Sequence, residues 1–225
     1  MAKEVVTPQE EMLENAQAQT ENFFEKNSKM VVTAIVVVLV LAAAIFGYKK
    51  LIVEPRLNDA QEMLFEAQYR FEQQNADFAL ALNGDENTPG FAQVIEKYGN
   101  TPAGNLANIY AAACALRLGE FDKAESYLAN YSKVDGLPGE LVNAMVVGMR
   151  GEIAVEKGDY AGAAAIFENA AKVSDNNFTA PMYLRKAAMA YKAAGNADKA
   201  RECLETINNK YSSSIEAREA EKLAE

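Results

Sequence analysis

Nineteen consecutive residues without a charged side chain, Met30 to Tyr48, constrain this chain more than any other stretch. They lie between Lys29 on one side and Lys49 and Lys50 on the other. A helix of this length spans about 28 Å, which is close to the roughly 30 Å hydrocarbon core of a bilayer. Because an isolated strand in lipid would leave its backbone groups unpaired, the sequence predicts one transmembrane helix over residues 30–48.

Two other interpretations of this stretch compete with a retained anchor. A cleavable signal peptide has a short basic start, and Ala42 to Ala44 superficially resemble its cleavage site. Residues 1–29 are instead long and rich in glutamate. A buried core helix is the second alternative, but such helices usually have a shorter uncharged span. We therefore expect an anchor that stays in the protein.

The tail over residues 1–29 contains Thr7-Pro8-Gln9-Glu10, which has the sequence form of a capping box and predicts the start of a short amphipathic helix. One apolar stripe at helical spacing follows, made of Met12, Leu13, Ala16, Thr20, Phe23 and Phe24. This stripe fits a helix that docks on a partner or on the membrane surface. It fits a weakly structured tail equally well.

Composition argues against several classes of function. The net charge is −10, and no cluster of Lys and Arg offers a surface for nucleic acid. The chain has no histidine, the side chain most used for proton transfer near neutral pH and a common metal ligand. We predict no catalytic residue, no metal and no cofactor, so an enzyme is the least favoured class. Cys114 and Cys203 fall in apolar helical patterns and are expected to be small buried side chains rather than a disulfide.

A long helix is expected after the anchor, over residues 57–82, because Leu57, Leu64, Phe71 and Phe78 lie seven apart. The stretch Asn83 to Gly90 then favours turns. It half-matches a calcium-binding loop, with the first, third, sixth and twelfth places held by Asp85, Asn87, Gly90 and Glu96. Pro89 in the fifth place supplies no side-chain oxygen, so we expect an inter-helix loop capped by Thr88.

A short phrase then repeats along the chain. Gly119 to Ala124 returns as Gly158 to Ala163 and again as Gly195 to Ala200, at spacings of 39 and 37 residues. Such periods indicate stacked helical hairpins. Glycine can adopt the left-handed conformation that ends a first helix, and the small alanine lets the second helix approach closely.

This phrase resembles the inter-helix turn of the tetratricopeptide repeat, although the tryptophan-like residue near each start and the repeat-ending proline are missing. The resemblance implies an all-α fold, in which a single N-terminal transmembrane helix is followed by a right-handed solenoid of helical hairpins. The repeat domain is expected over residues 49–225. Its repeats are expected near residues 57–98, 103–135, 141–174 and 181–211, with a capping helix over 213–225.

In repeats of this kind the first helices line a concave face, so the resemblance implies candidate partner-binding residues. These are Leu106, Ile109, Leu116, Met145, Val155, Met182, Arg185, Met189 and Lys192, with Ala113 and Gly148 beside them. Methionine suits surfaces that accept varied apolar partners. Packing against a neighbouring helix explains the same apolar residues equally well.

The overall layout is similar to membrane-anchored tetratricopeptide proteins of the bacterial inner membrane, of the YfgM-like kind. That resemblance implies an ancillary subunit of the Sec translocon, a non-enzymatic adaptor working with periplasmic chaperones or client polypeptides, with no nucleic acid and no small-molecule substrate. It places the repeat domain in the periplasm, whereas the count of basic residues beside the anchor favours the cytoplasm by one charge. The alternative function is a structural scaffold subunit of a cell-envelope complex.

Overall fold

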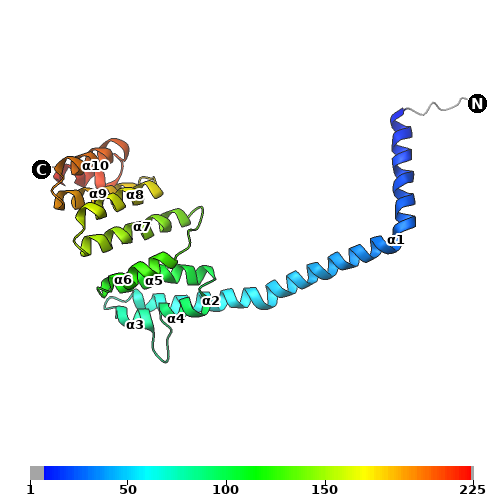
Figure 1. The fold of residues 1–225 in the computed structure, drawn as a ribbon, viewed down its shortest axis with the longest axis horizontal. Coiled ribbons are helices and arrows are strands. Elements are labelled where there is room, and N and C mark those ends of the chain that lie inside the picture. The colour runs from blue at the N-terminus through cyan, green and yellow to red at the C-terminus, as the bar shows by residue number, and fades with distance from the viewer. Residues whose placement is uncertain (1–7, 224–225) are drawn as a thin grey trace, which may run out of the picture. The chain divides into compact units, whose positions relative to one another are not determined.

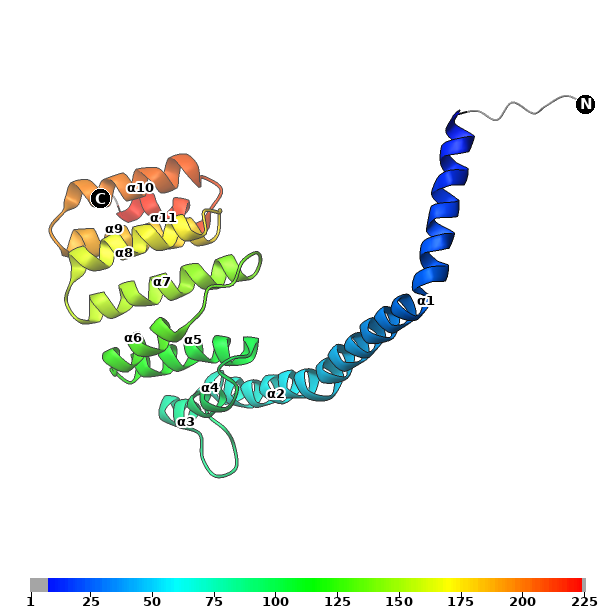
Figure 2. The same cartoon turned by 45° about the vertical axis from the view of Figure 1, so that its right-hand side comes forward.

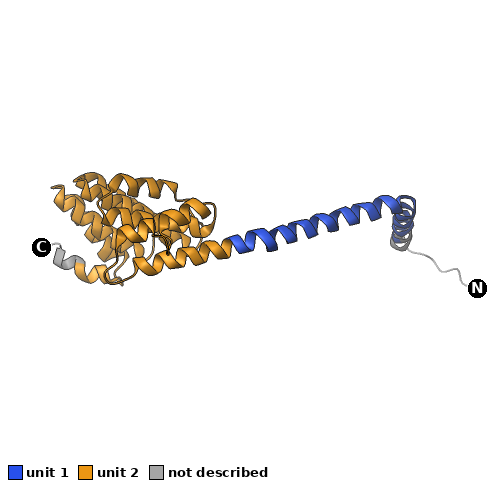
Figure 3. Ribbon diagram, turned by 90° about the horizontal axis from the view of Figure 1, so that it is seen from below, with its two compact units in different colours: residues 1–56 blue, residues 57–225 orange. Residues whose placement is uncertain are grey.

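The computed structural model describes the backbone of residues 8–223 and the side chains of residues 12–219 except Glu14. Thr7 and the side chain of Glu10, on which the predicted capping box depends, lie outside this described part, as do the last two residues of the predicted capping helix. Within it every regular element is helical, and the one β-bridge joins Gly84 to Pro89 in a loop. The chain divides into two compact units, residues 1–56 and 57–225 (Figure 3).

The first unit is built around helix α1, Pro8–Tyr48, which is followed by a short π-helix, η1, Lys49–Val53. Asn27 has non-helical dihedrals, so α1 consists of two helices joined at a kink. In the described chain, one helix is long and apolar enough to cross a membrane. An 18-residue stretch of this helix has a mean hydropathy of 2.9, and none of its residues is buried. That exposure argues against the alternative of a soluble core helix, because a core helix hides its apolar side chains.

The second unit begins in helix α2, Glu54–Phe71, whose buried Ala60, Leu64 and Ala67 form one apolar face. The prediction of a single helix over residues 57–82 is wrong, since a new short helix, α3, spans Phe78–Asn83. Asp77 caps α3 by accepting a hydrogen bond from the Leu80 amide. The break lets the rings of Phe71 and Phe78 meet edge to face, with their centroids 5.7 Å apart. Helix α4, Phe91–Tyr98, follows and completes this cluster with Phe91 and Val94.

Three helical hairpins follow and stack in chain order, as Figures 1 and 2 both show. Their bounds are α5 Pro102–Arg117 with α6 Phe121–Asn130, α7 Gly139–Glu156 with α8 Tyr160–Val173, and α9 Thr179–Ala193 with α10 Ala197–Lys210. Helix α11, Ile215–Leu223, packs on α9 and α10. The hairpins share buried alanines at their contacts, which allow helix axes to approach closely.

Each hairpin turns at one of the repeated glycines. Gly119, Gly158 and Gly195 have φ values of 75°, 81° and 78°, the left-handed region that residues with a Cβ rarely adopt. Asp159 and Asn196 then cap the second helices by accepting hydrogen bonds from the amides of Gly162 and Lys199. The conformation predicted for these glycines from the repeated phrase is confirmed.

Candidate functional site

The first helices of the three hairpins line one face of the second unit, where two pockets of 340 and 410 Å³ adjoin. Both pockets include Glu152 and Glu156 of α7, so together they form one groove. We call this surface the α5–α7–α9 groove. Its other lining residues are Phe71, Ala113, Leu116, Arg117, Met145, Met149, Val155, Tyr160, Phe167, Tyr183, Lys186, Met189, Ala190 and Ala193.

Two glycines of α7 make room for the aromatic floor of the groove. A Cβ on Gly148 would lie 2.2 Å from Cε1 of Tyr183, and a Cβ on Gly151 would lie 2.6 Å from Cε1 of Phe167. The two rings stack with centroids 6.4 Å apart and an interplanar angle of 14°. Both rings are almost fully buried. The floor is therefore preformed, because neither ring has space to turn without displacing the α7 backbone.

Lys186 is held by this floor. Its Nζ lies 5.7 Å from the ring centroid of Phe167 and 5.8 Å from that of Tyr183, and it forms an ion pair with Glu152. Burial, and then the negative charge of Glu152, raises the pKa of Tyr183 to about 12. The Lys186 ammonium therefore already has partners within the chain, namely the Glu152 carboxylate and the faces of two aromatic rings.

The two other charged side chains of the groove, Arg117 and Glu156, differ in whether they have a partner within the chain. The guanidinium of Arg117 lies 6.0 Å from the ring centroid of Phe78, so this cation also has a partner. Glu156 is exposed and borders both pockets. Among the side chains that the structure describes, none forms an ion pair or hydrogen bond with its carboxylate. The groove consequently offers two apolar pockets with an available negative charge between them.

The structure divides the predicted partner-binding residues into two groups. Leu116, Met145, Val155 and Met189 line the groove, as does Ala113. Met145 and Met189 keep 39% and 53% of their surface exposed, which leaves them accessible to a partner.

The other predicted residues do not reach the groove. Ile109 is buried, and Leu106 and Met182 pack against the core. Arg185 forms an ion pair with Glu219 of α11 at 3.2 Å. Lys192 is exposed near the end of α9 but lines neither pocket. Gly148, expected on the concave face, lies beneath Tyr183.

Sequence reasoning missed the aromatic and charged part of the groove, namely Phe71, Arg117, Glu152, Glu156, Tyr160, Phe167, Tyr183 and Lys186. Phe167 lies in α8, outside the first helices that the resemblance places on the concave face, and Tyr183 directly follows the predicted Met182. A pair of glycines within one helix was the available signal, since interior helical glycines often mark a close approach. The pattern cannot say which ring approaches, because the partner residues lie 16 and 35 positions away in the chain.

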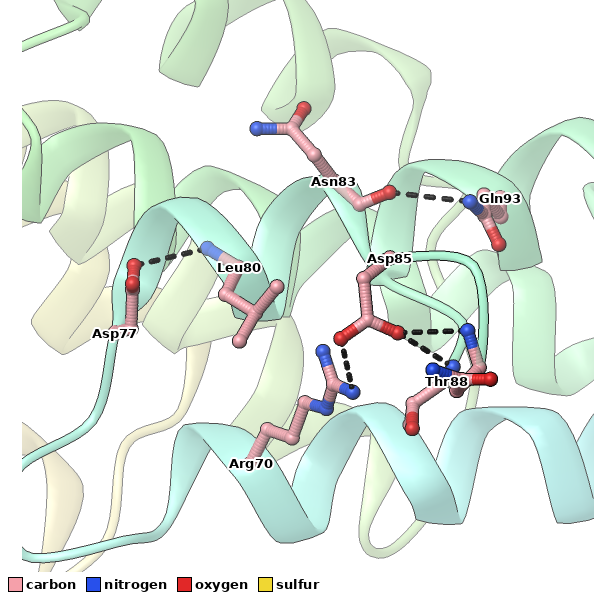
Figure 4. Close-up of polar contacts among 8 residues, drawn as sticks. Arg70, Asp77, Leu80, Asn83, Asp85, Thr88 and Gln93 are labelled. Atoms are coloured by element: carbon pink, nitrogen blue, oxygen red, sulfur yellow. Dashed lines mark hydrogen bonds and ion pairs between the residues drawn. The ribbon is translucent and has the colours of Figure 1, made fainter.

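In the loop between α3 and α4, the carboxylate of Asp85 is used for the structure of the loop itself (Figure 4). One Asp85 oxygen accepts hydrogen bonds from the amides of Asn87 and Thr88, both at 2.8 Å. The other oxygen pairs with Arg70 at 2.9 Å. The two amides and Arg70 lower the pKa of Asp85. No group of three His, Cys, Asp or Glu side chains that could hold a metal occurs within the described residues.

The predicted cap of this loop is wrong. Gly90, and not Thr88, is the N-cap of α4, and it has no side chain to cap with. The bridge between Gly84 and Pro89 fixes the loop instead, with Gly84 at φ 75° in close contact with Gly90. Backbone hydrogen bonding across the loop, and not a capping side chain, therefore holds the loop closed.

Both cysteines are free and buried, as predicted. Burial raises the pKa of Cys114 to about 12. Burial, with the nearby carboxylate of Glu168, raises the pKa of Cys203 to about 12 as well. Thiols that stay protonated to this pH are poor nucleophiles and poor metal ligands near neutral pH.

Comparison with known protein families gives two matches. Residues 21–137 match a tetratricopeptide repeat-like domain, a match that covers more than half of the chain. Residues 154–222 match a tetratricopeptide repeat. A comparison with curated proteins finds no match.

Proposed function

The chain belongs to the tetratricopeptide repeat-like family, and on that premise we propose that it is a membrane-tethered adaptor whose α5–α7–α9 groove binds protein partners. The observation that carries the proposal is the groove itself, where exposed methionines surround a preformed aromatic floor. Flexible, polarisable methionine adapts to different apolar side chains. A rigid floor lowers the entropy lost when a partner binds.

The charge of the groove narrows the kind of segment that it binds. Lys186 and Arg117 are engaged within the chain, whereas Glu156 is available between the two pockets. A segment with two apolar side chains on either side of a Lys or Arg matches this arrangement. An acidic segment or a free C-terminal carboxylate would meet repulsion from Glu156.

We further propose that the tether is the helix over residues 30–48 and that the repeat domain lies in the periplasm of a bacterial inner-membrane protein. The length and exposure of this helix support the tether, and the YfgM-like layout supports the side. Protease treatment of spheroplasts tests the side. Digestion of residues 57–225 without permeabilising the inner membrane supports a periplasmic domain, and protection until permeabilisation contradicts it.

The partners that the YfgM-like resemblance favours are subunits of the Sec translocon and periplasmic chaperones. A photo-reactive amino acid at Met145 or Met189 tests this in cells that produce the full-length chain. We expect cross-links to a translocon or chaperone subunit from both positions. A control at Glu205, which is exposed on α10 and lines neither pocket, is expected to give none. Equal cross-linking from all three positions would count against the groove.

A scaffold subunit of an envelope complex is the second candidate function. The rigid floor formed by the rings of Phe167 and Tyr183 suits one fixed partner as well as a varied one, whereas the exposed methionines favour the adaptor. Binding of unfolded polypeptides separates the two candidates. An adaptor for clients is expected to bind several unrelated unfolded chains through the groove, and a scaffold is expected to bind none of them.

A further inference from the structure

The first part of α1 carries an apolar face that the groove and the anchor do not explain. Met12, Leu13, Phe23 and Phe24 have between 50% and 74% of their surface exposed. Phe23 and Phe24 contact each other edge to face, with centroids 6.0 Å apart. No helix of the first unit, as far as the structure describes it, packs over this face. The face therefore needs a partner outside the unit to hide it from water.

The face is narrow and well separated from the charged side of the helix. At 100° per residue the six apolar positions from Met12 to Phe24 fall within an arc of about 120°. Glu21 and Glu25 lie outside this arc, and exposed Ala18 lies opposite its centre. A helix with one apolar arc and one polar arc suits a boundary between an apolar medium and water.

A kink then separates this segment from the membrane-crossing part of α1. Asn27 has φ −115° and ψ 15°, and its side-chain amide donates a hydrogen bond to the Phe23 carbonyl at 3.0 Å. Figures 1 and 2 both show the helix changing direction at the start of the apolar span. The segment before the kink is therefore free to run in a different direction from the anchor.

The short distance along the chain between this apolar face and the membrane span indicates that the face meets the bilayer surface. Phe24 precedes Met30 by six residues, which is about 9 Å along a helix. Each headgroup layer is roughly 5–7 Å deep, because the two layers together add roughly 10–15 Å to the hydrocarbon core, and the kink at Asn27 lies only about 4.5 Å before the span, so a segment that turns there stays in this layer. With the span in place, the two phenylalanines lie at the level of the headgroups.

We propose that the segment before Asn27 is an interfacial helix, which lies on the same bilayer with Met12, Leu13, Phe23 and Phe24 inserted at the boundary between headgroups and acyl chains. This inference rests on the proposed anchor over residues 30–48. The polar arc is acidic, so apolar burial and attachment to the anchor hold the helix, and attraction to anionic lipid does not.

Tryptophan fluorescence tests the proposal directly, because the chain contains no tryptophan. Three single-tryptophan variants of the full-length chain are reconstituted in vesicles of phosphatidylcholine and phosphatidylglycerol, with or without lipids brominated near the top of the acyl chain. Phe24→Trp probes the proposed face. Ala18→Trp is the matched control on the opposite side of the same helix, and Phe46→Trp, exposed in the span, reports insertion of the anchor.

We expect brominated lipid to lower the emission of Phe24→Trp and of Phe46→Trp about twofold and to leave Ala18→Trp nearly unchanged, as an interfacial depth of about 5–10 Å requires. Quenching of Phe46→Trp with equal, weak quenching of the other two variants overturns the interfacial helix and leaves the anchor standing. Failure to quench Phe46→Trp overturns the anchor itself. Protection of Phe24→Trp from a water-soluble quencher without bromine quenching shows that another part or another copy of this chain covers the face, and it also overturns the proposal.

Discussion

Tyr183 and Gly148 show how one residue without a side chain shapes the groove. The ring of Tyr183 occupies the space that a Cβ on Gly148 would fill, and Phe167 does the same over Gly151. The Gly148–Tyr183 contact joins α7 to α9 of the next hairpin, and the Gly151–Phe167 contact joins α7 to α8 of the same hairpin. Neither contact can be read from a local sequence pattern. Packing of these rings sets both the depth of the groove and the position of Lys186 above it.

Gly148→Ala is expected to lower the free energy of unfolding by about 1–3 kcal/mol, because the new methyl group must displace the buried Tyr183 ring. Chemical denaturation of residues 57–225 measures this change. In a Tyr183→Ala background the same substitution is expected to be neutral or stabilising by up to about 1 kcal/mol, since only the higher helix propensity of alanine remains. Equal destabilisation in both backgrounds would show that the ring contact is not the cause.

The raised pKa of Cys114 predicts that the stability of the fold depends on pH. The pKa of Cys114 rises from 9.0 to about 12 on folding, so the folded chain keeps a proton that the unfolded chain releases above pH 9. The stabilising contribution is complete below this pH and is lost as the pH rises toward the folded pKa. We expect the free energy of unfolding to fall between about pH 9 and pH 11.

Denaturation of wild type and Cys114→Ala across this range provides the check. Below about pH 9 the variant is expected to be less stable than the wild type, because it leaves a small cavity. Its stability should nevertheless fall less steeply with pH than that of the wild type. Parallel curves for the two proteins would mean that Cys114 titrates alike in the folded and unfolded chains.

At the scale of elements, the three glycine turns set the hairpins and the loops between hairpins join them. Asp175, in the loop after α8, accepts hydrogen bonds from Tyr211 and Lys210 at the end of α10, both at 2.5 Å. These two groups lower the pKa of Asp175. These contacts hold the C-terminal end of α10 against the loop between α8 and α9. The Lys210–Asp175 ion pair is about half exposed, which limits how much it stabilises the fold.

Substitutions at Gly158 test the turn that joins α7 to α8. Its φ of 81° strains any residue with a Cβ, whereas nothing lies within 4 Å of the position that a Cβ would take. We expect stability to decrease in the order Gly, Asn, Ala, Val, with Gly158→Ala costing about 1–2 kcal/mol. Thermal unfolding of the four proteins measures the order. An alanine variant as stable as the wild type would contradict the left-handed conformation.

At the scale of the whole molecule, the two units have different requirements. The first unit exposes apolar side chains from Met30 to Tyr48 and suits an apolar surrounding. The second unit buries its apolar side chains in three clusters that follow one another along the stacked helices. Contacts between neighbouring hairpins carry the stability of such a stack.

Residues 57–225 are therefore expected to fold without the first unit. Circular dichroism should show a highly helical protein, and chemical denaturation should give a cooperative transition, because the three clusters share helices α5 and α7 or lie against them. A control that also lacks residues 212–225 loses α11 and its Arg185–Glu219 ion pair, and we expect it to be less stable. An unfolded or non-cooperative 57–225 domain would show that it depends on the first unit.

The sequence by itself determined the features that depend on local pattern. An uncharged run of 19 residues specifies a helix suited to a bilayer because length and hydropathy alone decide it. The repeated glycines at 119, 158 and 195 specify the turns, because left-handed φ is a property of the residue itself. The all-α class and the number of hairpins after residue 102 follow from these turns and the apolar periodicity.

Only the tertiary structure decided the break between α2 and α3 and the make-up of the groove. The apolar spacing from Leu57 to Phe78 fits a continuous helix. Phe71 instead packs on the rings of Phe78, Phe91 and Tyr110, and these contacts form only when α4 and α5 are in place. Likewise Met182 and Arg185 follow the same helical pattern as Met189, but neighbouring helices cover the first two. Which apolar residues stay exposed depends on what packs against them, and that is a property of the fold and not of any segment.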